Sequence, residues 1–334
     1  MLRDTLKTLL TAYGPSGNER AVAETIKSLI AAHVDSMRID ALGNLIVEKY
    51  GTDEGGKRIM FSAHMDHIGF VVTDIDEQGF LRVHNVGGVS PCISAARHVI
   101  FENGVEGVLY CQPLKGEEMA MKHLFIDIGA ENRAEAKALV QPGDMAVYAP
   151  DYFELGDHRA ASPAMDDRCC CALLCELMMY LDEPRNTIVG VFSSQEEVGI
   201  RGAKTAAYSV NPDLGVGLDV TAWGDTPECK LPAIRLGQGA AVKFIDRSMI
   251  ASPSVRDALL QAAQEAGVPA QREVLPFGGQ DGSAIQHARA GIPAGCLSIP
   301  CRYVHSPAEV IDMRDMEGAL RILMTMHGRK ARSC

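Results

Sequence analysis

The sequence predicts an α/β protein with a mainly parallel central sheet covered by helices on both faces, and a small β-rich domain inserted into it. Two observations carry this prediction. Apolar stretches typical of buried strands alternate with amphipathic helical stretches in residues 1–68 and 163–334, which favours parallel strands in one larger domain. Residues 69–162 instead contain a series of short strand-like stretches, which indicates a separate domain. A chain of 334 residues is long enough for both.

The N-terminal part is expected to form two helices and then two strands. Residues 14–17, Gly-Pro-Ser-Gly, break the helical pattern between the two helices. Ser16 and Glu19 match a capping box at the start of the second helix. Strand-like stretches follow at 44–48 and 58–62. The apolar positions at helical spacing are Leu2, Leu6, Leu9 and Tyr13, and then Val22, Ile26, Leu29 and Ile30.

The inserted domain is expected to consist of short strands and tight turns. Asn103-Gly104 between two strand-like stretches is a strong two-residue hairpin signal, and Pro142-Gly143-Asp144 marks another turn. The strand candidates are 70–73, 80–83, 98–101, 105–110, 125–128 and 145–149. This pattern indicates a small β-rich domain and not a continuation of the α/β alternation.

The α/β alternation returns after Asp166. A continuous apolar stretch at 187–193 predicts a strand that is buried on both faces. Ligands in such sheets bind beyond the carboxyl ends of the strands, so the chemistry is expected there. The other candidates are a helical stripe of Cys171, Leu174, Cys175 and Met178, a helix at 201–209, strands at 214–220 and 241–245, a helix from Ser252-Pro253 through Ala266 with Gly267 as its stop, a strand at 292–299, and a last helix with Met316, Ala319, Leu320 and Leu323 on its apolar face.

Composition narrows the class of protein. Acidic residues outnumber basic ones, 43 to 32, so the net charge is −11 at pH 7. An acidic surface repels phosphate backbones and anionic lipids, so neither nucleic acid nor a membrane is expected as a partner. No apolar stretch approaches the length of a membrane span, and the N-terminus shows no signal-peptide pattern. The protein is therefore expected to be cytoplasmic.

The ten cysteines support the same location. Without a secretion signal they predict free thiols in a reducing compartment and not a disulfide framework. Cys169, Cys170 and Cys171 are consecutive, which suits neither a zinc-binding spacing nor a simple disulfide. We interpret them as small helix residues with Cys171 on the buried side.

Acidic and imidazole side chains stand where predicted strands end or a helix begins. These positions are His64 and Asp66, Asp166 and Asp167, Glu196 and Glu197, Asp219, and His305. Each alone has an ordinary structural interpretation, since paired aspartates can cap a helix and paired glutamates can lie in a solvated loop. Residues two apart share a face of extended chain, so Asp66 is placed to support His64.

Taken together, these residues predict a metal centre at one edge of the sheet. Two histidines, two aspartates and a glutamate offer nitrogen and oxygen ligands without cysteine, which suits zinc, cobalt or manganese. An odd number of carboxylates permits one of them to bridge two ions, and paired ions can hold an attacking water and polarise a carbonyl. A further glutamate beside them would then act as the general base and pass its proton to a leaving amine.

In this order and spacing the residues resemble the tetrahedral, or TET-type, metalloaminopeptidases, described as glutamyl or deblocking aminopeptidases and sometimes as endoglucanases. The resemblance runs through nearly the whole chain. The matching stretches are 14–17, 62–69, 142–144, 165–168, 195–203, 218–221, 225–227, 278–281 and 302–310. The resemblance implies a zinc-peptidase-like fold in which the insertion 69–162 is a β-barrel-like dimerisation domain. Homo-oligomers are implied too, with dimers assembling into hollow dodecamers.

The resemblance also implies a metal ligand set. Asp166 would bridge two divalent metal ions per subunit, with zinc, cobalt and manganese all left open. The remaining ligands would be His64 and Asp219 at one ion, and Glu197 and His305 at the other.

Two further roles follow from the same resemblance. Glu196 would be the general base, and Asp66 would orient His64. The peptide bond between Asp166 and Asp167 is expected to be cis.

The chain departs from the family pattern at two positions. Gln280 stands where the family usually has threonine, and Ala240 where it tends to have proline. Gln280 and Asp281 are expected near the substrate pocket, so the preferred first residue stays open. Arg247, after the strand at 241–245, either attracts an acidic first residue or is a solvated structural arginine. A neutral pocket would favour leucine or methionine.

The leading hypothesis is a dinuclear metalloaminopeptidase that acts on peptides. A related amidohydrolase of acylated amino acids, or a carboxypeptidase, would use the same centre with another pocket. A non-catalytic peptide-binding assembly protein is the alternative from another class, but it would be expected to lack Glu196 or the ligands. An endoglucanase is disfavoured, because a glycosidase works with two carboxylates and has no use for this histidine-rich set.

Overall fold

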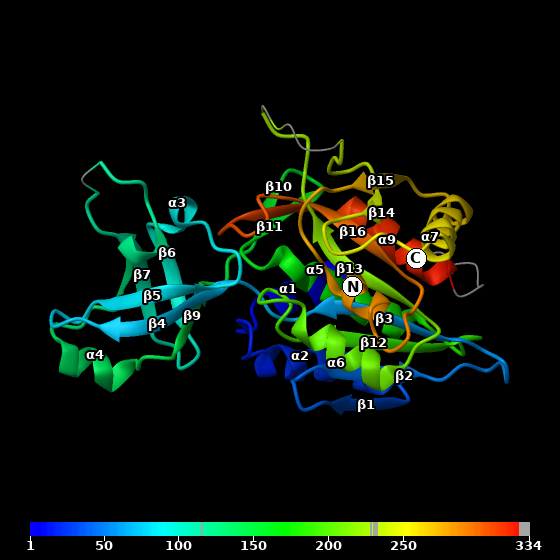
Figure 1. Cartoon of the computed structure of the whole chain (residues 1–334), viewed down its shortest axis with the longest axis horizontal. Helices are drawn as coiled ribbons and strands as arrows, with labels where there is room; N and C mark the ends of the chain where they lie inside the picture. The colour runs from blue at the N-terminus through cyan, green and yellow to red at the C-terminus, as the bar shows by residue number, and fades with distance from the viewer. Residues whose placement is uncertain (115, 228, 230–232, 327–334) are drawn as a thin grey trace.

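The computed structural model describes residues 1–334 except 115, 228, 230–232 and 327–334. Figure 1 shows two parts, a small β-barrel on the left, in cyan and green, and a larger α/β part on the right. The larger part holds the sheet from which the site is built. This is the predicted fold class, an α/β domain with an inserted β-rich domain.

The large sheet runs in the order β1-β2-β12-β3-β13-β16-β17-β11-β10, with β14 and β15 branching from β16. Its strands are β1 (Ser36–Ile39), β2 (Leu45–Lys49), β3 (Arg58–His64), β10 (Phe153–Leu155), β11 (Arg159–Ser162), β12 (Thr187–Ser193), β13 (Leu214–Thr221), β14 (Ala240–Ile245), β15 (Ala270–Val274), β16 (Ala294–Arg302) and β17 (Glu309–Asp312). Parallel pairing joins β12 to β3, β3 to β13 and β13 to β16 at the centre, and β14 to β15 at the branch. The outer strands pair antiparallel.

Helices cover both faces of this sheet. The bounds are α1 (Leu2–Leu10), α2 (Arg20–Ile30), α5 (Met165–Tyr180), α6 (Arg201–Val210), α7 (Pro253–Ala266), α8 (Asp281–Gln286) and α9 (Met313–Thr325). Alternate residues of β3 divide the core between the faces: Phe61 packs with the cluster formed by α1, α2, α5, α7 and α9, and Met60 packs with the cluster formed by α6 and α8. A strand buried on both faces explains the continuous apolar stretches in the sequence.

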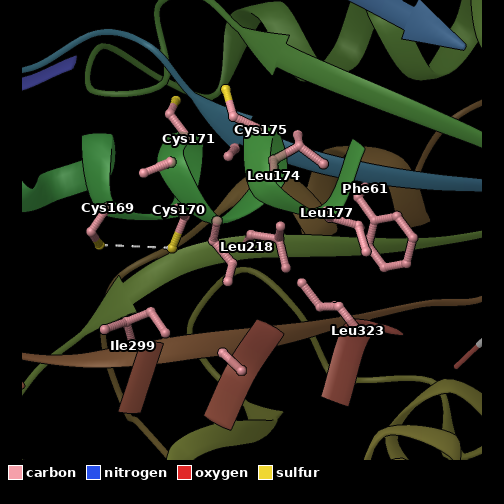
Figure 2. Close-up of a cluster of buried hydrophobic side chains, with 14 of the residues drawn as sticks. Phe61, Cys169, Cys170, Cys171, Leu174, Cys175, Leu177, Leu218, Ile299 and Leu323 are labelled. Carbon is pink, nitrogen blue, oxygen red and sulfur yellow. Dashed lines mark hydrogen bonds between the residues drawn. The ribbon is translucent and has the colours of Figure 1, made fainter. Parts of the chain in front are cut away.

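Helix α5 lies inside the larger part and is buried from Met165 to Met178. Cys171 is buried as expected, and so are Cys169 and Cys170, because α1 and α9 pack on the helix beside the sheet. The nine cysteines among the described residues are free thiols. Figure 2 shows this core, with labels on Phe61, Cys169, Cys170, Cys171, Leu174, Cys175, Leu177, Leu218, Ile299 and Leu323.

The small part is a closed barrel with the strand order β4-β5-β8-β7-β6-β9. Its strands are β4 (Gly69–Ile75), β5 (Leu81–Val86), β6 (Arg97–Phe101), β7 (Glu106–Cys111), β8 (Leu124–Asp127) and β9 (Met145–Tyr148), with short helices α3 (Pro91–Ser94) and α4 (Arg133–Leu139). The Asn103-Gly104 turn joins β6 to β7, with the Gly104 amide donating to the Phe101 carbonyl at 3.0 Å. The barrel strands end at Tyr148, whereas β10 and β11, inside the predicted insertion 69–162, join the large sheet through β17.

The predicted capping box before α2 is absent from the described structure. The Ser16 hydroxyl donates to Asp66 Oδ2 at 2.6 Å, and Glu19 Oε1 accepts from the amides of Gly17 and Gln195. Both residues of the motif therefore bind loops beside the site and do not cap the helix. None of the described helices has the length and apolar character needed to cross a membrane.

Candidate metal centre

The parallel strands end together at one edge of the sheet. Ser193, the last residue of β12, pairs in register with His64, the last residue of β3. Asp219 lies two residues before the end of β13, and Glu196 and Glu197 lie in the loop that follows β12. The sheet thus brings these side chains from three strands to one place, where ligands of α/β sheets usually bind.

Asp166, at the start of α5, lies between the two histidines. Its Oδ1 is 3.0 Å from Nε2 of His64, and its Oδ2 is 3.3 Å from Nε2 of His305. Each imidazole also faces a second carboxylate: His305 Nε2 is 3.1 Å from Oε2 of Glu197, and His64 Nε2 is 4.0 Å from Oδ1 of Asp219. The Asp166 carboxylate therefore lies between two sets of possible ligands, one with His64 and Asp219 and the other with His305 and Glu197.

The backbone around Asp166 turns its side chain out of the helix. Asp166 and Asp167 have non-helical dihedral angles at the start of α5, and the peptide bond between them is cis, as expected. The Asp166 amide donates to Oε2 of Glu309 at 2.9 Å, and the His305 amide donates to Oε1 of the same carboxylate at 2.7 Å. Glu309, on β17, thus fixes two candidate ligands through their main chains. The sequence analysis did not single it out, because a lone acid in a strand carries no distinct signal.

Asp66 supports the site in two ways. Its backbone carbonyl lies 2.8 Å from Nδ1 of His64, so Nδ1–H can donate there and leave the Nε2 lone pair for a metal. Its carboxylate accepts from the amides of Glu196 and Glu197 at 2.9 and 3.1 Å. Asp66 therefore faces His64 with both its main chain and its side chain, because its Oδ1 lies 3.6 Å from Nδ1 of His64, and the same carboxylate holds the loop after β12.

The donor set fits divalent cations. The ligand atoms of His64, Asp166 and Glu197 lie within 4.8 Å of one another, and so do those of His64, Asp167 and Asp219. Nitrogen and carboxylate oxygen are the ligands that zinc, cobalt and manganese accept in proteins. Buried carboxylates at this density are costly without a compensating cation.

Burial and the neighbouring charges shift the pKa values of these side chains. Burial raises the pKa values of Glu196 and Asp219 well above their usual range, and repulsion from neighbouring carboxylates adds to the effect. Burial would lower the pKa of His305, but Glu197 and Asp166 outweigh it and raise that pKa to about 12. Burial also opposes ionisation of Asp166, yet His305 and His64 hold its pKa below the usual range.

A cavity of about 560 Å³ opens beside these residues. Its lining begins at His64, Asp166, Glu196, Glu197, Asp219 and His305. It continues to apolar side chains, among them Ile200, Trp223, Leu275, Phe277 and Val304, and to the polar side chains of Thr221 and Lys243. The candidate metal ligands are thus part of the wall of a pocket large enough for an amino-acid side chain.

The three predicted pocket residues, Gln280, Asp281 and Arg247, are not among the described residues that line this cavity. Gln280 is buried beneath the pocket, accepts from the Gly282 amide at the start of α8 and donates to Asp246 at 3.2 Å. Asp281 accepts from the hydroxyls of Ser62 and Ser193 at 2.6 and 2.5 Å. Arg247 is exposed, and it is not among the described residues that line the cavity.

The pocket residues that the sequence analysis missed have one visible signal. Lys243 interrupts the apolar strand β14, and a lysine inside such a stretch indicates a buried partner. Trp223 and Phe277 stand in loops, where a single aromatic residue carries no comparable signal.

The barrel contributes backbone to the site. Gly87 and Gly88 follow β5, and Gly88 lines the cavity. A Cβ atom added at Gly88 would lie 2.6 Å from Nδ1 and 2.9 Å from Cε1 of His305. A Cβ atom at Gly87 would lie 3.1 Å from Cβ of Glu197. The absence of side chains at these two positions leaves room for two candidate ligands.

Comparison with known proteins gives consistent matches. The family model of the M42 glutamyl aminopeptidases matches residues 43–322. A putative aminopeptidase of Acetivibrio thermocellus is 44% identical over 324 residues, covering 96% of this chain and 97% of the relative.

Solved structures agree with this. An aminopeptidase from the archaeon Desulfurococcus kamchatkensis superposes with a TM-score of 0.93 at 34% identity, covering 98% of this chain and 95% of the other. The TET1 peptidase of Pyrococcus horikoshii, which can assemble into a tetrahedron or a large octahedral shell, gives 0.88 at 32% identity, with coverage of 98% and 99%.

Proposed function

The chain belongs to the M42 glutamyl aminopeptidase family and is a metal-dependent aminopeptidase, and we propose that it works through a dinuclear centre with Glu196 as general base. The observation that supports this most strongly is the position of Asp166 between His64 and His305. A carboxylate that faces two imidazoles through its two oxygens is arranged to bridge two ions.

The residues that would hold the metal fall into two sets around Asp166. His64 and Asp219 would complete one site, and His305 and Glu197 the other. Divalent zinc, cobalt or manganese bound there would supply Lewis-acid polarisation of the scissile carbonyl and would lower the pKa of the attacking water.

Glu196 would move the proton. Its side chain lines the cavity next to the candidate ligands, and its amide is held by Asp66. In this role the Glu196 carboxylate takes a proton from water as the oxygen attacks the carbonyl carbon. It then gives that proton to the nitrogen of the leaving amine as the C–N bond breaks.

The same proposal extends to assembly. We infer a homo-oligomer in which the barrel is the dimerisation domain, with dimers as the units of a dodecamer. The supporting observations are the likeness to the TET1 peptidase and the exposed apolar side chains of Val108 and Tyr110 on the barrel strand β7.

Removal and return of metal tests the proposed function. Metal-stripped protein is expected to be inactive and to regain activity with zinc, cobalt or manganese. The substrates are paired peptides with free and acetylated N-termini. Release of the first residue from the free peptide alone is the expected result, measured by chromatography. Cleavage of the acetylated peptide alone would favour the deacylase alternative, and full activity without metal would contradict the proposal.

A Gly88→Ala substitution is expected to weaken one metal site, because the new methyl group meets the His305 ring at 2.6 Å. The clash would turn His305 away from its present orientation, and disturbing the orientation of a ligand typically costs about 10–100-fold in metal affinity or activity. Titration of the stripped protein with metal, followed by elemental analysis, measures this.

Gly55→Ala is the matched control for this substitution. Gly55 is exposed, and within the described structure an added Cβ there meets no atom within 4 Å. Wild-type affinity for both ions in the Gly88→Ala protein would show that Gly88 does not position His305.

A further inference from the structure

The cavity wall includes polar side chains that are not candidate metal ligands, and the inference drawn from them concerns their charge. It rests on the proposed function: if the scissile carbonyl lies at the ligands, the side chain of the first residue occupies the rest of the cavity. That space is walled by apolar side chains, including Ile200, Leu275 and Phe277. Its polar lining there is Lys243 and Thr221.

Lys243 is the cation nearest to that space, and it is already paired twice. Its side chain is 3% exposed, and Nζ lies 2.9 Å from Oε1 of Glu273 and 3.5 Å from Oδ2 of Asp246. Lys243 and Glu273 are partners in the parallel register of β14 and β15, so the sheet itself sets their pairing. Both carboxylates are fully buried.

The two carboxylates are fixed by further contacts. The Thr221 hydroxyl donates to Oε1 of Glu273 at 2.6 Å, and Gln280 Nε2 donates to Oδ2 of Asp246 at 3.2 Å. Asp246 Oδ1 accepts from the amides of Ser248 and Met249, both at 2.7 Å. These bonds leave neither carboxylate free to move away when a substrate enters.

The charge of this cluster is negative. Burial would lower the pKa of Lys243, but Glu273 and Asp246 outweigh it and raise that pKa, so the side chain is an ammonium group at neutral pH. One ammonium group then faces two carboxylates, which leaves a net charge of about −1 in a buried region where charges are poorly screened. Oε2 of Glu273 is also buried and has no hydrogen-bond partner in the part of the chain that the structure describes.

Each class of first residue meets this cluster differently. A carboxylate side chain would leave water for a buried region whose cation is already neutralised by two carboxylates, so the cost of its desolvation is not repaid. An ammonium side chain would be desolvated in the same way, beside the ammonium group of Lys243. A neutral apolar side chain meets neither penalty and packs against Ile200, Leu275 and Phe277. Arg247, the alternative receptor for an acidic residue, is outside the described lining of the cavity.

We propose that Lys243 is a structural cation, neutralised by Glu273 and Asp246, and that the pocket selects peptides whose first residue is neutral and apolar and rejects an acidic one. The specificity thus depends on the sum of three buried charges and not on the lysine alone.

The first test compares five peptides that differ only at the first residue: leucine, methionine, phenylalanine, lysine and glutamate. With metal-loaded enzyme, kcat/KM for leucine is expected to exceed that for glutamate by at least about tenfold. Equal or faster release of glutamate would overturn this inference and leave the proposed function standing. Hydrolysis of none of the peptides would overturn the proposed function and this inference with it.

The second test changes the charge of the cluster. Glu273→Gln keeps the oxygen that accepts from Thr221 but removes one negative charge. The ratio of leucine to glutamate hydrolysis is expected to fall about tenfold, chiefly through a lower KM for the glutamate peptide. Asp246→Asn removes one negative charge from the second partner of Lys243, and it is also expected to lower the ratio of leucine to glutamate hydrolysis. If one of the two variants fails to fold, the other still tests the inference.

Glu265→Gln, on the exposed surface of α7, is the matched control for net charge. In this control variant the ratio of leucine to glutamate hydrolysis is expected to equal that of the wild type. An unchanged ratio in both cluster variants would overturn the inference, and so would the same shift in the surface control.

Discussion

Glu196→Gln is expected to lower the rate of peptide hydrolysis by about 10²–10⁴-fold while the protein still binds its metal ions. Glutamine has the shape of glutamate but cannot take a proton from water at neutral pH. Glu196 also belongs to none of the groups of candidate ligand atoms found among the described residues. The main-chain amide of Glu196 donates to Oδ1 of Asp66, and this hydrogen bond survives the change because it does not involve the Glu196 side chain. The measurement is kcat at saturating metal, together with elemental analysis of the same sample.

Glu197→Gln is the informative partner of this experiment, because it makes the same chemical change one residue along the chain. Glu197 Oε2 lies 3.1 Å from His305, so this variant is expected to lose occupancy of one metal site. Turnover close to the wild-type value in Glu196→Gln would show that the base is wrongly assigned. Loss of metal from that variant would make Glu196 a ligand.

Asp166→Ala is expected to abolish both metal binding and activity. Its two oxygens face His64 and His305 separately, so its removal takes one ligand from each site. His64→Ala removes a ligand from one site only and is expected to retain more metal. Elemental analysis after dialysis gives the number of ions per chain.

The fold of Asp166→Ala is expected to persist, because the Asp166 amide still donates to Glu309 and one buried negative charge is gone. Circular dichroism checks this, with Asp157→Ala as the exposed control. Two ions retained in Asp166→Ala would contradict the bridging assignment.

The centre of the fold was predictable because its strands are buried on both faces. Thr187–Ser193 reads as a continuous apolar stretch and forms β12 with those bounds. The strands β10 and β17 were not predicted, because they are three and four residues long and depend on pairing with distant segments. Pairing of this kind is set by tertiary packing and leaves no periodic signal in the sequence.

The candidate ligands were predictable for a related reason. Parallel strands end at the same edge, so acids and imidazoles placed near the carboxyl ends of β3, β12 and β13 come together. The charge around the rest of the cavity could not be predicted from strand ends in this way. Whether Lys243 attracts or repels an acidic residue depends on Glu273, which is thirty residues away and adjacent only because β14 pairs with β15.

The contact of Gly88 with His305 bears on how such a protein can diverge. An inserted domain is often regarded as an exchangeable module, tied to its host by two inert crossings of the chain. Here a loop inside the inserted domain, between β5 and β6, forms part of the wall of the cavity, against a side chain proposed to hold metal. The barrel strands can therefore change with the surfaces they contact, whereas Gly87 and Gly88 are constrained by the two candidate ligands beside them. A barrel taken from another protein would have to keep this loop for those ligands to fit.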